Sequence, residues 1–355
     1  MTSVKHAHVV GLGLIGASLS LALRDAGWRV TGDDVDPDVV ALATSGGVIV
    51  AQAPDPHVTL IAIATPAGAV ADVAKEYLAR FSDPGLLVTD VAGVKSAIVQ
   101  SVTDPRFLGG HPMAGSELRG LAGARADLFQ GCTWVLTPTA LTPADVYTRL
   151  HGQLREIGAN VVAVSPSDHD RLVALASHVP HLLAGALMNQ AAEAAREDAV
   201  LLQLAAGGFR DMTRIAAGDP AIWPDILFEN RDAVSSALIA LEERLTGLRA
   251  ALESRDRPTL EASLTSASLA RRQLPGRALS SEDMAYLRVL IADRPGSLAR
   301  VTMTASEMLV NIYDIEIAHS LEGNRGTLLL AVDAQQAERF MAALRHEDFD
   351  VVRER

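Results

Sequence analysis

The sequence predicts three domains in order along the chain: an α/β domain with a parallel sheet, an all-α domain, and a small α+β domain. Up to residue 164, short apolar runs alternate with helix-like segments, a pattern typical of a parallel α/β sheet. From 165 to 272 no strand-like run appears, and alanine and leucine recur with helical periodicity. Strand patterns return at 284–355. We therefore expect domains at 1–164, 165–272 and 284–355, with a linker at 273–283.

The first domain should contain several short buried strands, at 8–11, 29–33, 58–64, 86–90 and 132–137. The runs at 58–64 and 86–90 are apolar on both faces, as expected for strands that helices cover on two sides. A helix is expected at 15–26, between the first two strands. This alternation supports the parallel α/β prediction.

The second domain should begin with a long helix capped by Ser167 and Asp170. Pro180 lies inside the same helical pattern, and an interior proline costs about 3 kcal/mol, so the helix should kink or restart there. Another long amphipathic helix is expected at 230–253. The third domain has the order β-α-β-β-α-β, which predicts a ferredoxin-like unit.

Composition excludes several classes of protein. The net charge is −12, so the basic surface of a nucleic-acid binder is missing. With a single cysteine, Cys132, neither a disulfide framework nor a cysteine-rich metal site is expected, and a cytoplasmic location fits. No run of about 18 uninterrupted apolar residues appears, so we expect no membrane span, and glycines in the apolar run at 9–23 argue against a signal peptide.

A glycine-rich motif, Gly11-Leu12-Gly13-Leu14-Ile15-Gly16, follows the first predicted strand and opens the first helix. In the G-x-G-x-x-G fingerprint of a Rossmann domain, the glycines form a tight turn, admit a pyrophosphate and let helix and strand pack closely. The helix N-terminus then binds the phosphates. The sequence therefore predicts a dinucleotide site.

Asp33 and Asp34 lie 20 and 21 residues after Gly13, where this fingerprint places an acid that binds the ribose hydroxyls. A carboxylate repels a 2′-phosphate, so NAD is favoured over NADP, with Asp34 as the ligand. Thr65 and Asp90, at the ends of the next predicted strands, complete the residues assigned to the cofactor. The alternative is a glycine-rich turn followed by a coincidental acidic turn at 33–36.

His111 lies in a glycine-rich loop, 108–117, beyond the Rossmann strands. Oxidation of a hydroxyl group requires a base with a pKa near 7, and histidine meets this directly. A surface or capping histidine is the alternative for a loop position.

The helical domain holds further candidates, His178, His181, Asp211, Arg214 and Trp223. The two histidines are three apart and share a helical face, either as site residues or as ordinary helix histidines; no metal ligand set is apparent. Asp211 and Arg214 form either a surface ion pair or an anion clamp. Trp223 belongs either to the site or to the core or a subunit interface.

These segments together resemble the prephenate dehydrogenase family. The matching segments are GLGLIGAS at 11–18, TDVAGVKS at 89–96, GGHPMAGSE at 109–117, SHVPH at 177–181 and GGFRDMTRIAAGDPAIW at 207–223. The resemblance covers most of residues 6–270. It implies an NAD-dependent oxidative decarboxylation of prephenate to 4-hydroxyphenylpyruvate in tyrosine biosynthesis, by a homodimer with intertwined helical domains.

The resemblance also implies residue roles. His111 would take the substrate hydroxyl proton, and Arg214, held by Asp211, would bind a substrate carboxylate. His178 and His181 would line the pocket, with His181 the more direct contact. Glu117 would gate or polarise the site, and Trp223 would close it from the dimer partner.

One position departs from the family pattern. Many members have a serine in the loop that follows the strand end, where its hydroxyl helps position substrate and nicotinamide; here the residue is Gly93. Either Ser96 or a water molecule takes that part, or turnover is weaker.

Residues 284–353 resemble an ACT-type regulatory domain. The resemblance implies tyrosine as a feedback inhibitor, bound near Asp293-Arg294-Pro295-Gly296 and Asn311. A ferredoxin-like dimerisation module without a ligand is the alternative.

Three other functions remain open from the sequence. Another Rossmann dehydrogenase with a helical second domain would need a lysine–asparagine or similar catalytic pair, and none is as clear as His111 with Arg214. An NAD-binding amino-acid sensor with little catalysis is kept open by Gly93. Arogenate, which has an amine in place of the keto group of prephenate, is the alternative substrate.

Overall fold

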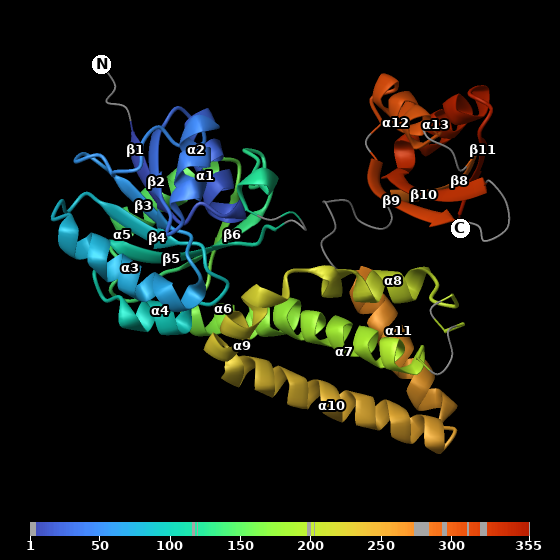
Figure 1. Cartoon of the computed structure of the whole chain (residues 1–355). Coiled ribbons are helices and arrows are strands. Elements are labelled where there is room, and N and C mark those ends of the chain that lie inside the picture. Colours follow the sequence, from blue (N-terminus) through green and yellow to red (C-terminus); the bar gives the residue numbers. More distant parts are fainter. Residues whose placement is uncertain are drawn as a thin grey trace. The chain divides into compact units, whose positions relative to one another are not determined.

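The computed structural model describes residues 5–115, 118, 120–196, 200, 201, 203–272, 284–292, 297–310, 312–319 and 325–354. The chain forms two compact units, Met1–Glu243 and Arg244–Arg355 (Figure 1).

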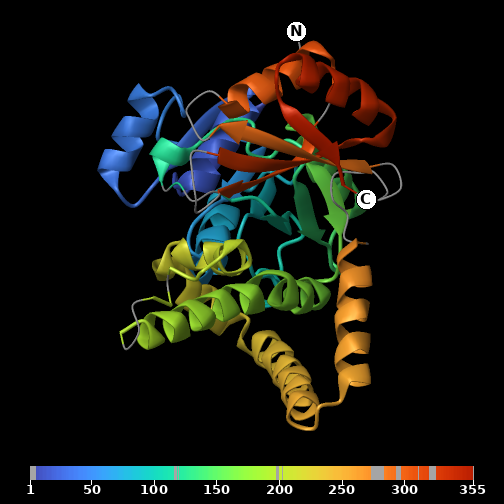
Figure 2. The same cartoon turned by 90° about the vertical axis from the view of Figure 1, so that its right-hand side faces the viewer.

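A seven-stranded sheet forms the centre of the first unit (Figure 2). Its strands are β1 (His6–Val10), β2 (Arg29–Asp33), β3 (Leu60–Ile63), β4 (Leu87–Asp90), β5 (Phe107–Pro112), β6 (Thr133–Thr137) and β7 (Asn160–Ala163), in the order β2-β1-β3-β4-β5-β6-β7. The strands from β2 to β5 are parallel, as predicted.

The prediction of a parallel sheet is wrong for one pair, because β6 runs antiparallel to β5. Parallel neighbours need a crossover connection, usually a helix on one face of the sheet. The described part of the connection between β5 and β6 contains only a short 3₁₀ turn, Leu121–Gly123. The chain therefore turns back without a crossover helix, and β6 pairs with β5 in the opposite direction. β7 then pairs with β6 in parallel.

Helices cover both faces of this sheet, as the apolar strands predicted. α1 (Leu14–Asp25) and α5 (Ala144–Glu156) pack on one face, and α2 (Pro37–Ser45) joins the same core. α3 (Ala67–Arg80) and α4 (Ser96–Ser101) pack on the other. Along β3 the side chains alternate between the two cores, Leu60 and Ala62 in one and Ile61 and Ile63 in the other.

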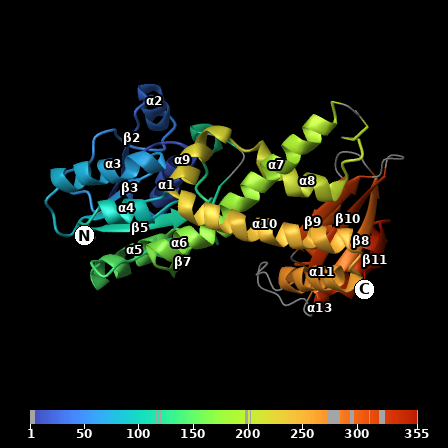
Figure 3. The same ribbon diagram turned by 90° about the horizontal axis from the view of Figure 1, so that it is seen from below.

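After β7 the first unit is helical, as predicted. The elements are α6 (Pro166–Val173), a π-helical turn (Ala174–His178), α7 (Val179–Ala194), α8 (Gly207–Thr213), 3₁₀ turns at Arg214–Ala217 and Pro220–Ile222, α9 (Trp223–Glu229) and the start of α10 (Arg231–Glu253). α9 packs on α3, with Ile226 against the core of that face (Figure 3).

The predicted cap of the first helix is wrong. Ser165, not Ser167, caps α6, and its side chain accepts the amide hydrogen of Asp168. Asp170 lies within the helix, on its buried side. Pro180 lies in the first turn of α7, directly after the π-helical turn, so the helical run is locally irregular before the proline but continues through it.

One helical run in the described part of the chain, Pro166–Ala194, is long and apolar enough to cross a membrane by length and composition. However, it carries two buried polar side chains, His169 and Asp170, that bond to the sheet portion of the first unit. We therefore interpret its apolar residues as protein contacts rather than as lipid contacts.

The second unit contains the end of α10, α11 (Arg257–Arg272) and a four-stranded antiparallel sheet. The sheet and its helices follow the order β8 (Met284–Ala292), α12 (Ser297–Glu307), β9 (Ile312–His319), β10 (Arg325–Asp333), α13 (Ala334–His346) and β11 (Asp350–Arg353). The strand order is β11-β8-β10-β9. The predicted ferredoxin-like order is thus confirmed; the expected linker at 273–283 lies outside the described residues.

His8 is fully buried in the middle of β1. Its Nδ1 lies 2.9 Å from Thr31 Oγ1 and its Nε2 lies 3.0 Å from the Tyr77 hydroxyl. Burial lowers the pKa of His8 to about 4. The fold therefore holds this imidazole neutral.

Protonation of His8 should destabilise the first unit in acid. The imidazole has an ordinary pKa of 6.5 and a folded pKa of about 4, so between these values the unfolded chain binds more protons and stability falls as pH falls. The contribution is complete above about pH 6.5 and is lost with a slope of at most about 1.4 kcal/mol per pH unit. The free energy of unfolding, measured with urea at several pH values from 7 to 4, should fall less steeply with falling pH in His8→Gln than in the parent. His57→Gln, which changes an exposed histidine, is the control and should behave as the parent. Equal slopes in all three proteins would contradict this.

Candidate active site

The glycine-rich turn after β1 has the geometry that a dinucleotide requires. Gly11 has a φ of +92°, and a Cβ there would lie 2.5 Å from the carbonyl oxygen of Ala64. A Cβ on Gly16 would collide with the carbonyl oxygen of Gly11. Around Gly13, by contrast, a Cβ would meet no atom within 4 Å apart from those of its chain neighbours and its own helix backbone, which leaves room at the start of α1.

Asp34 is tied to this turn. Its Oδ2 accepts the amide hydrogen of Leu12 at 2.7 Å, and its Oδ1 accepts that of Asp36 at 3.0 Å. Asp33 instead accepts a hydrogen bond from the Gln52 side-chain amide at 2.8 Å. Thr65, after β3, has a buried hydroxyl without a hydrogen-bond partner. An open cradle, a nearby carboxylate and an unsatisfied hydroxyl fit a bound NAD.

A buried ion pair holds the loop after β4. The side chains of Asp90 and Lys95 are both fully buried and bonded to each other. Lys95 Nζ also donates to the carbonyl of Gly110 at 2.9 Å, and Asp90 Oδ1 accepts the amide hydrogen of Gly110 at 3.1 Å. Burial lowers the pKa of Lys95, although Asp90 opposes this shift. The Asp90 carboxylate is thus occupied in positioning the loop and β5, which disfavours its predicted contact with the cofactor.

His111 lies on a strand, not in the loop that the glycines predicted. It belongs to β5, opposite Val135 of β6. The preceding glycines are required by close neighbours: a Cβ on Gly109 would lie 2.6 Å from Thr137 Oγ1, and one on Gly110 would lie 2.8 Å from the carbonyl oxygen of Asp90. The glycines therefore reflect tight packing around a rigid strand.

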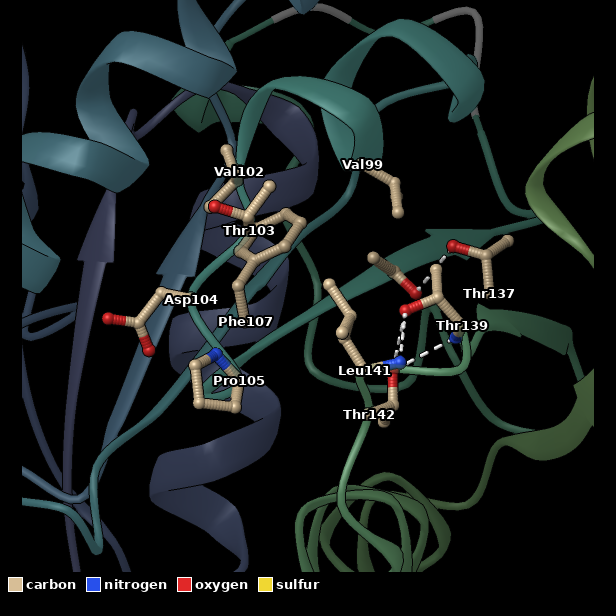
Figure 4. Close-up of a pocket in the computed structure, with 11 residues that line it drawn as sticks. Val99, Val102, Thr103, Asp104, Pro105, Phe107, Thr137, Thr139, Leu141 and Thr142 are labelled. Carbon is tan, nitrogen blue, oxygen red and sulfur yellow. Dashed lines mark hydrogen bonds between the residues drawn. The ribbon is translucent and has the colours of Figure 1, made fainter.

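A separate small pocket lies beside the same strand (Figure 4). Its lining comes from α4, from β5 and the segment before it, and from the end of β6 and the loop after it, and includes Val99, Phe107, Thr137, Thr139 and Leu141. His111 is not part of its lining, so this pocket is distinct from the candidate site.

His111 begins a chain of three side chains that leads into α6. Its Nδ1 lies 2.8 Å from His169 Nε2, and His169 Nδ1 lies 2.8 Å from Asp170 Oδ1. Asp170 also accepts the amide hydrogens of Lys95 and Ser96, at 2.8 and 2.7 Å. The helical segment is thus bonded directly to the loop after β4.

Gly93 lies next to the other side of the His111 ring. A Cβ at Gly93 would be 3.8 Å from both Nε2 and Cε1 of His111, an ordinary contact distance. Burial lowers the pKa of His111 well below its usual value, and His169, Lys95 and His178 lower it further. His111 is therefore a neutral imidazole at pH 7, with Nε2 adjacent to the loop.

A second histidine is held by Asn230, the residue before α10. The Asn230 side-chain amide donates to the carbonyl of Asp170 at 2.8 Å and lies 3.2 Å from His178 Nδ1. Because a carbonyl only accepts, this group is the NH₂, and His178 Nδ1 must accept its other hydrogen. Burial lowers the pKa of His178 to about 4. His178 is thus neutral and carries its proton on Nε2.

The remaining helical candidates lie around His181. Trp223 stacks on its ring at a centroid distance of 3.6 Å, and Trp223 also meets His178 edge to face at 6.2 Å. Burial lowers the pKa of His181. The turn that begins with Arg214 packs against α7, and Asp211 precedes it in α8; both side chains are exposed. Glu117 lies outside the described residues.

Sequence reasoning missed three residues of this site: His169, Asp170 and Asn230. A signal was present, because His169, Asp170 and Val173 form the buried side of the short α6. A histidine and an aspartate on the buried side of a helix require polar partners. The partners themselves lie 58 to 75 residues away in the sequence, at His111 and Lys95, so the pairing could not be inferred from local spacing.

The chain is similar to known proteins over most of its length. Residues 19–163 match the family model of the prephenate dehydrogenase nucleotide-binding domain, and residues 165–266 match that of the prephenate dehydrogenase dimerisation domain. The prephenate dehydrogenase of Bacillus subtilis strain 168 is 31% identical over 352 residues, which cover 94% of this chain and 95% of the relative.

Two solved structures are also similar. Prephenate dehydrogenase from A. aeolicus, in complex with hydroxyphenyl propionate and NAD⁺, has a TM-score of 0.71 and 28% identity, over 77% of this chain and 99% of that chain. Synechocystis arogenate dehydrogenase has a TM-score of 0.65 and 30% identity, over 75% of this chain and 98% of that chain. The full-length similarity, with the matches to both domains, shows that the chain belongs to the prephenate dehydrogenase family of NAD-dependent oxidoreductases.

Proposed function

We propose that the chain catalyses the oxidative decarboxylation of prephenate to 4-hydroxyphenylpyruvate. The observation that carries this proposal is the setting of His111: a neutral, half-buried imidazole whose Nδ1 is engaged by His169 and whose Nε2 lies beside the loop after β4. Such an atom can accept a proton from a bound hydroxyl group. The match to the family supports prephenate as the source of that hydroxyl.

The residues of the first unit would hold NAD⁺ at the carboxyl edge of the sheet. The turn from Gly11 to Gly16 and the start of α1 would bind the pyrophosphate, and Asp34 would bind the ribose hydroxyls. The unsatisfied hydroxyl of Thr65 would gain a partner there. When bound, NAD⁺ would supply the acceptor for the hydrogen of C4, which leaves the substrate ring together with the two electrons of its C–H bond.

His111 would perform the proton transfer. Its Nε2 takes the proton of the C4 hydroxyl while that carbon is oxidised, and the bond to the ring carboxylate then breaks. The electrons of that bond enter the ring, carbon dioxide leaves, and the aromatic product forms. The phenolate oxygen takes the proton back from Nε2. Aromatisation makes the overall step effectively irreversible.

The helical segment would bind the anionic groups of the substrate. Arg214 would pair with a substrate carboxylate, with Asp211 orienting it. His178, which carries its proton on Nε2, can donate a hydrogen bond to an oxygen of the substrate. His181, packed beneath Trp223, would form the wall of the pocket.

We further propose that the chain acts as a homodimer in the cytoplasm and that tyrosine is its feedback inhibitor. The match to a dimerisation domain supports the dimer. The ferredoxin-like order of the second unit supports an ACT-type domain. The residues expected near tyrosine, Asp293 to Gly296 and Asn311, lie outside the described residues.

Arogenate is the alternative substrate, and the similarity to the Synechocystis enzyme favours keeping it. Formation of NADH, followed at 340 nm with purified protein, NAD⁺ and either prephenate or arogenate, tests both. We expect turnover with prephenate and its inhibition by added tyrosine. Turnover with arogenate but not with prephenate would identify arogenate as the substrate. No turnover with either compound, in protein that binds NAD⁺, would overturn the proposal in favour of a sensor or another dehydrogenase.

Replacement of His111 by asparagine should lower kcat by at least about 10²-fold, because the general base is lost. Affinity for NAD⁺, measured by calorimetry, should be unchanged. His57→Asn, an exposed histidine in the turn before β3, is the matched control and should behave as the parent. Turnover of His111→Asn at the parental rate would eliminate His111 as the base.

Replacement of Arg214 by alanine should mainly raise KM. The loss of a charge-assisted contact with a carboxylate corresponds to roughly 2–3 kcal/mol in kcat/KM. Arg210→Ala, in the preceding turn of helix, is the control and should have little effect. An unchanged KM in Arg214→Ala would place the carboxylate site elsewhere.

Replacement of Asp34 by alanine should weaken NAD⁺ binding and relax the preference for NAD⁺ over NADP⁺, because the charge that repels a 2′-phosphate is removed. Asp33→Ala should have the smaller effect, since Asp33 is engaged by Gln52. Ratios of kcat/KM for the two cofactors provide the measurement. The reverse ranking of the two variants would assign the ribose to Asp33.

A further inference from the structure

The hydrogen bonds around Asp170 determine where the protons of the neighbouring imidazoles lie. Burial raises the pKa of Asp170, but hydrogen bonds from His169, Ser96 and Lys95 outweigh it and hold the pKa below its usual value. At neutral pH the group is therefore a carboxylate, which can only accept. His169 Nδ1, 2.8 Å from Asp170 Oδ1, must donate.

This donor role fixes the rest of the chain. A neutral imidazole has one N–H, so Nε2 of a neutral His169 is an acceptor. His111 Nδ1 lies 2.8 Å from that atom and must then donate to it. Nε2 of His111 is left with a lone pair, on the side of the ring that faces Gly93.

We propose that Asp170 and His169 are positioning residues of the reaction, which hold His111 in the tautomer with a free Nε2 and share the positive charge that its ring gains. The inference rests on the proposed function, because it assigns a task around the base of that reaction. Neither residue needs to touch the substrate. The chain is a carboxylate–imidazole–imidazole counterpart of the carboxylate–imidazole pair of serine hydrolases, where loss of the carboxylate costs about 10⁴-fold in kcat.

The proton remains within the site through the cycle. The substrate O–H bond breaks and an N–H bond forms at His111 Nε2, which gives an imidazolium. Its Nδ1 proton can move along the 2.8 Å bond to His169, which brings the charge next to Asp170. When carbon dioxide has left, the phenolate oxygen regains the Nε2 proton and the chain returns to its starting state, with no net proton released.

The surrounding charges explain why such support is needed. Lys95, His169 and His178 all oppose protonation of His111, whereas Asp170 is the group that favours it. The charge of Asp90 is engaged by Lys95 through their buried ion pair. Asp170 is therefore the carboxylate placed to stabilise an imidazolium at His111.

The tautomer can be measured without turnover. In ¹⁵N-histidine-labelled protein at pH 7.5, long-range ¹H–¹⁵N spectra should show His111 with a protonated Nδ1 and an unprotonated Nε2. The signals are assigned by their loss in His111→Asn. In His169→Phe, which removes the acceptor, the population should move towards the Nε2–H form. A proton on Nε2 of His111 in the parent protein would overturn the proposal, even if the protein does not oxidise prephenate.

Kinetics test the positioning role separately. Asp170→Asn and His169→Gln should lower kcat by about 10²–10⁴-fold, with the Kd for NAD⁺ within about threefold of the parent. Asp170→Asn should also move the acid limb of kcat/KM to lower pH, because the charge that raises the pKa of His111 is removed. Asp168→Asn, which changes an exposed aspartate of the same helix, is the matched control and should leave kcat and the pH dependence of kcat/KM unchanged.

Double variants separate positioning from general damage. In a His111→Asn background, His169→Gln should cause no further loss of kcat, because it acts only through His111. Multiplicative losses in the double variant would overturn the proposal, as would parental kcat and pH dependence in folded His169→Gln. Absence of turnover in the parent would instead overturn the proposed function. The tautomer measurement would then decide whether Asp170 and His169 position His111.

Discussion

The site depends on the buried carboxylate of Asp170. It accepts one amide hydrogen from the loop after β4, one from the first residue of α4, and one hydrogen from its own helix, through His169. A buried charge is tolerated only when its lone pairs are satisfied, and removal of one partner from such a group typically costs several kcal/mol. Helix, loop and imidazole are therefore constrained together. The same group that joins the helical segment to the sheet also determines the orientation of the proposed base.

A second buried charge pair makes this arrangement rigid. Asp90 and Lys95 each contact the backbone of Gly110, the residue that precedes His111. His111 thus extends from a strand whose backbone is held by two side chains, next to a loop held by the same pair. Placement on a rigid element, with neighbours that fix the ring, provides the preorganised geometry that proton transfer requires.

Much of this could be predicted from the sequence. The glycine turn, the acid after β2 and the five expected strands of the first domain depend on local patterns, and the structure places them within a few residues of expectation, whereas β5 and β7 had no strand prediction. The predictions that were wrong depended on contacts between distant residues. The glycines before His111 indicated a loop, although they are needed because Asp90 and Thr137 approach the strand closely. Asp170 resembled a helix cap, although its partners come from the loop after β4.

The helical segment that carries Arg214 and Trp223 has little core of its own within the chain. Among the described residues, the elements from α8 to α9 contain no buried side chain, and Leu204, Met212 and Phe228 are 75%, 67% and 73% exposed. Apolar area contributes about 25 cal/mol per Å² when it is removed from water, so these side chains favour association. A second copy of the chain would cover them, as the match to a dimerisation domain leads us to propose. Because the same elements carry the proposed carboxylate ligand, association would also restrict the motion of Arg214, so that the affinity for substrate and the stability of the dimer depend on one surface.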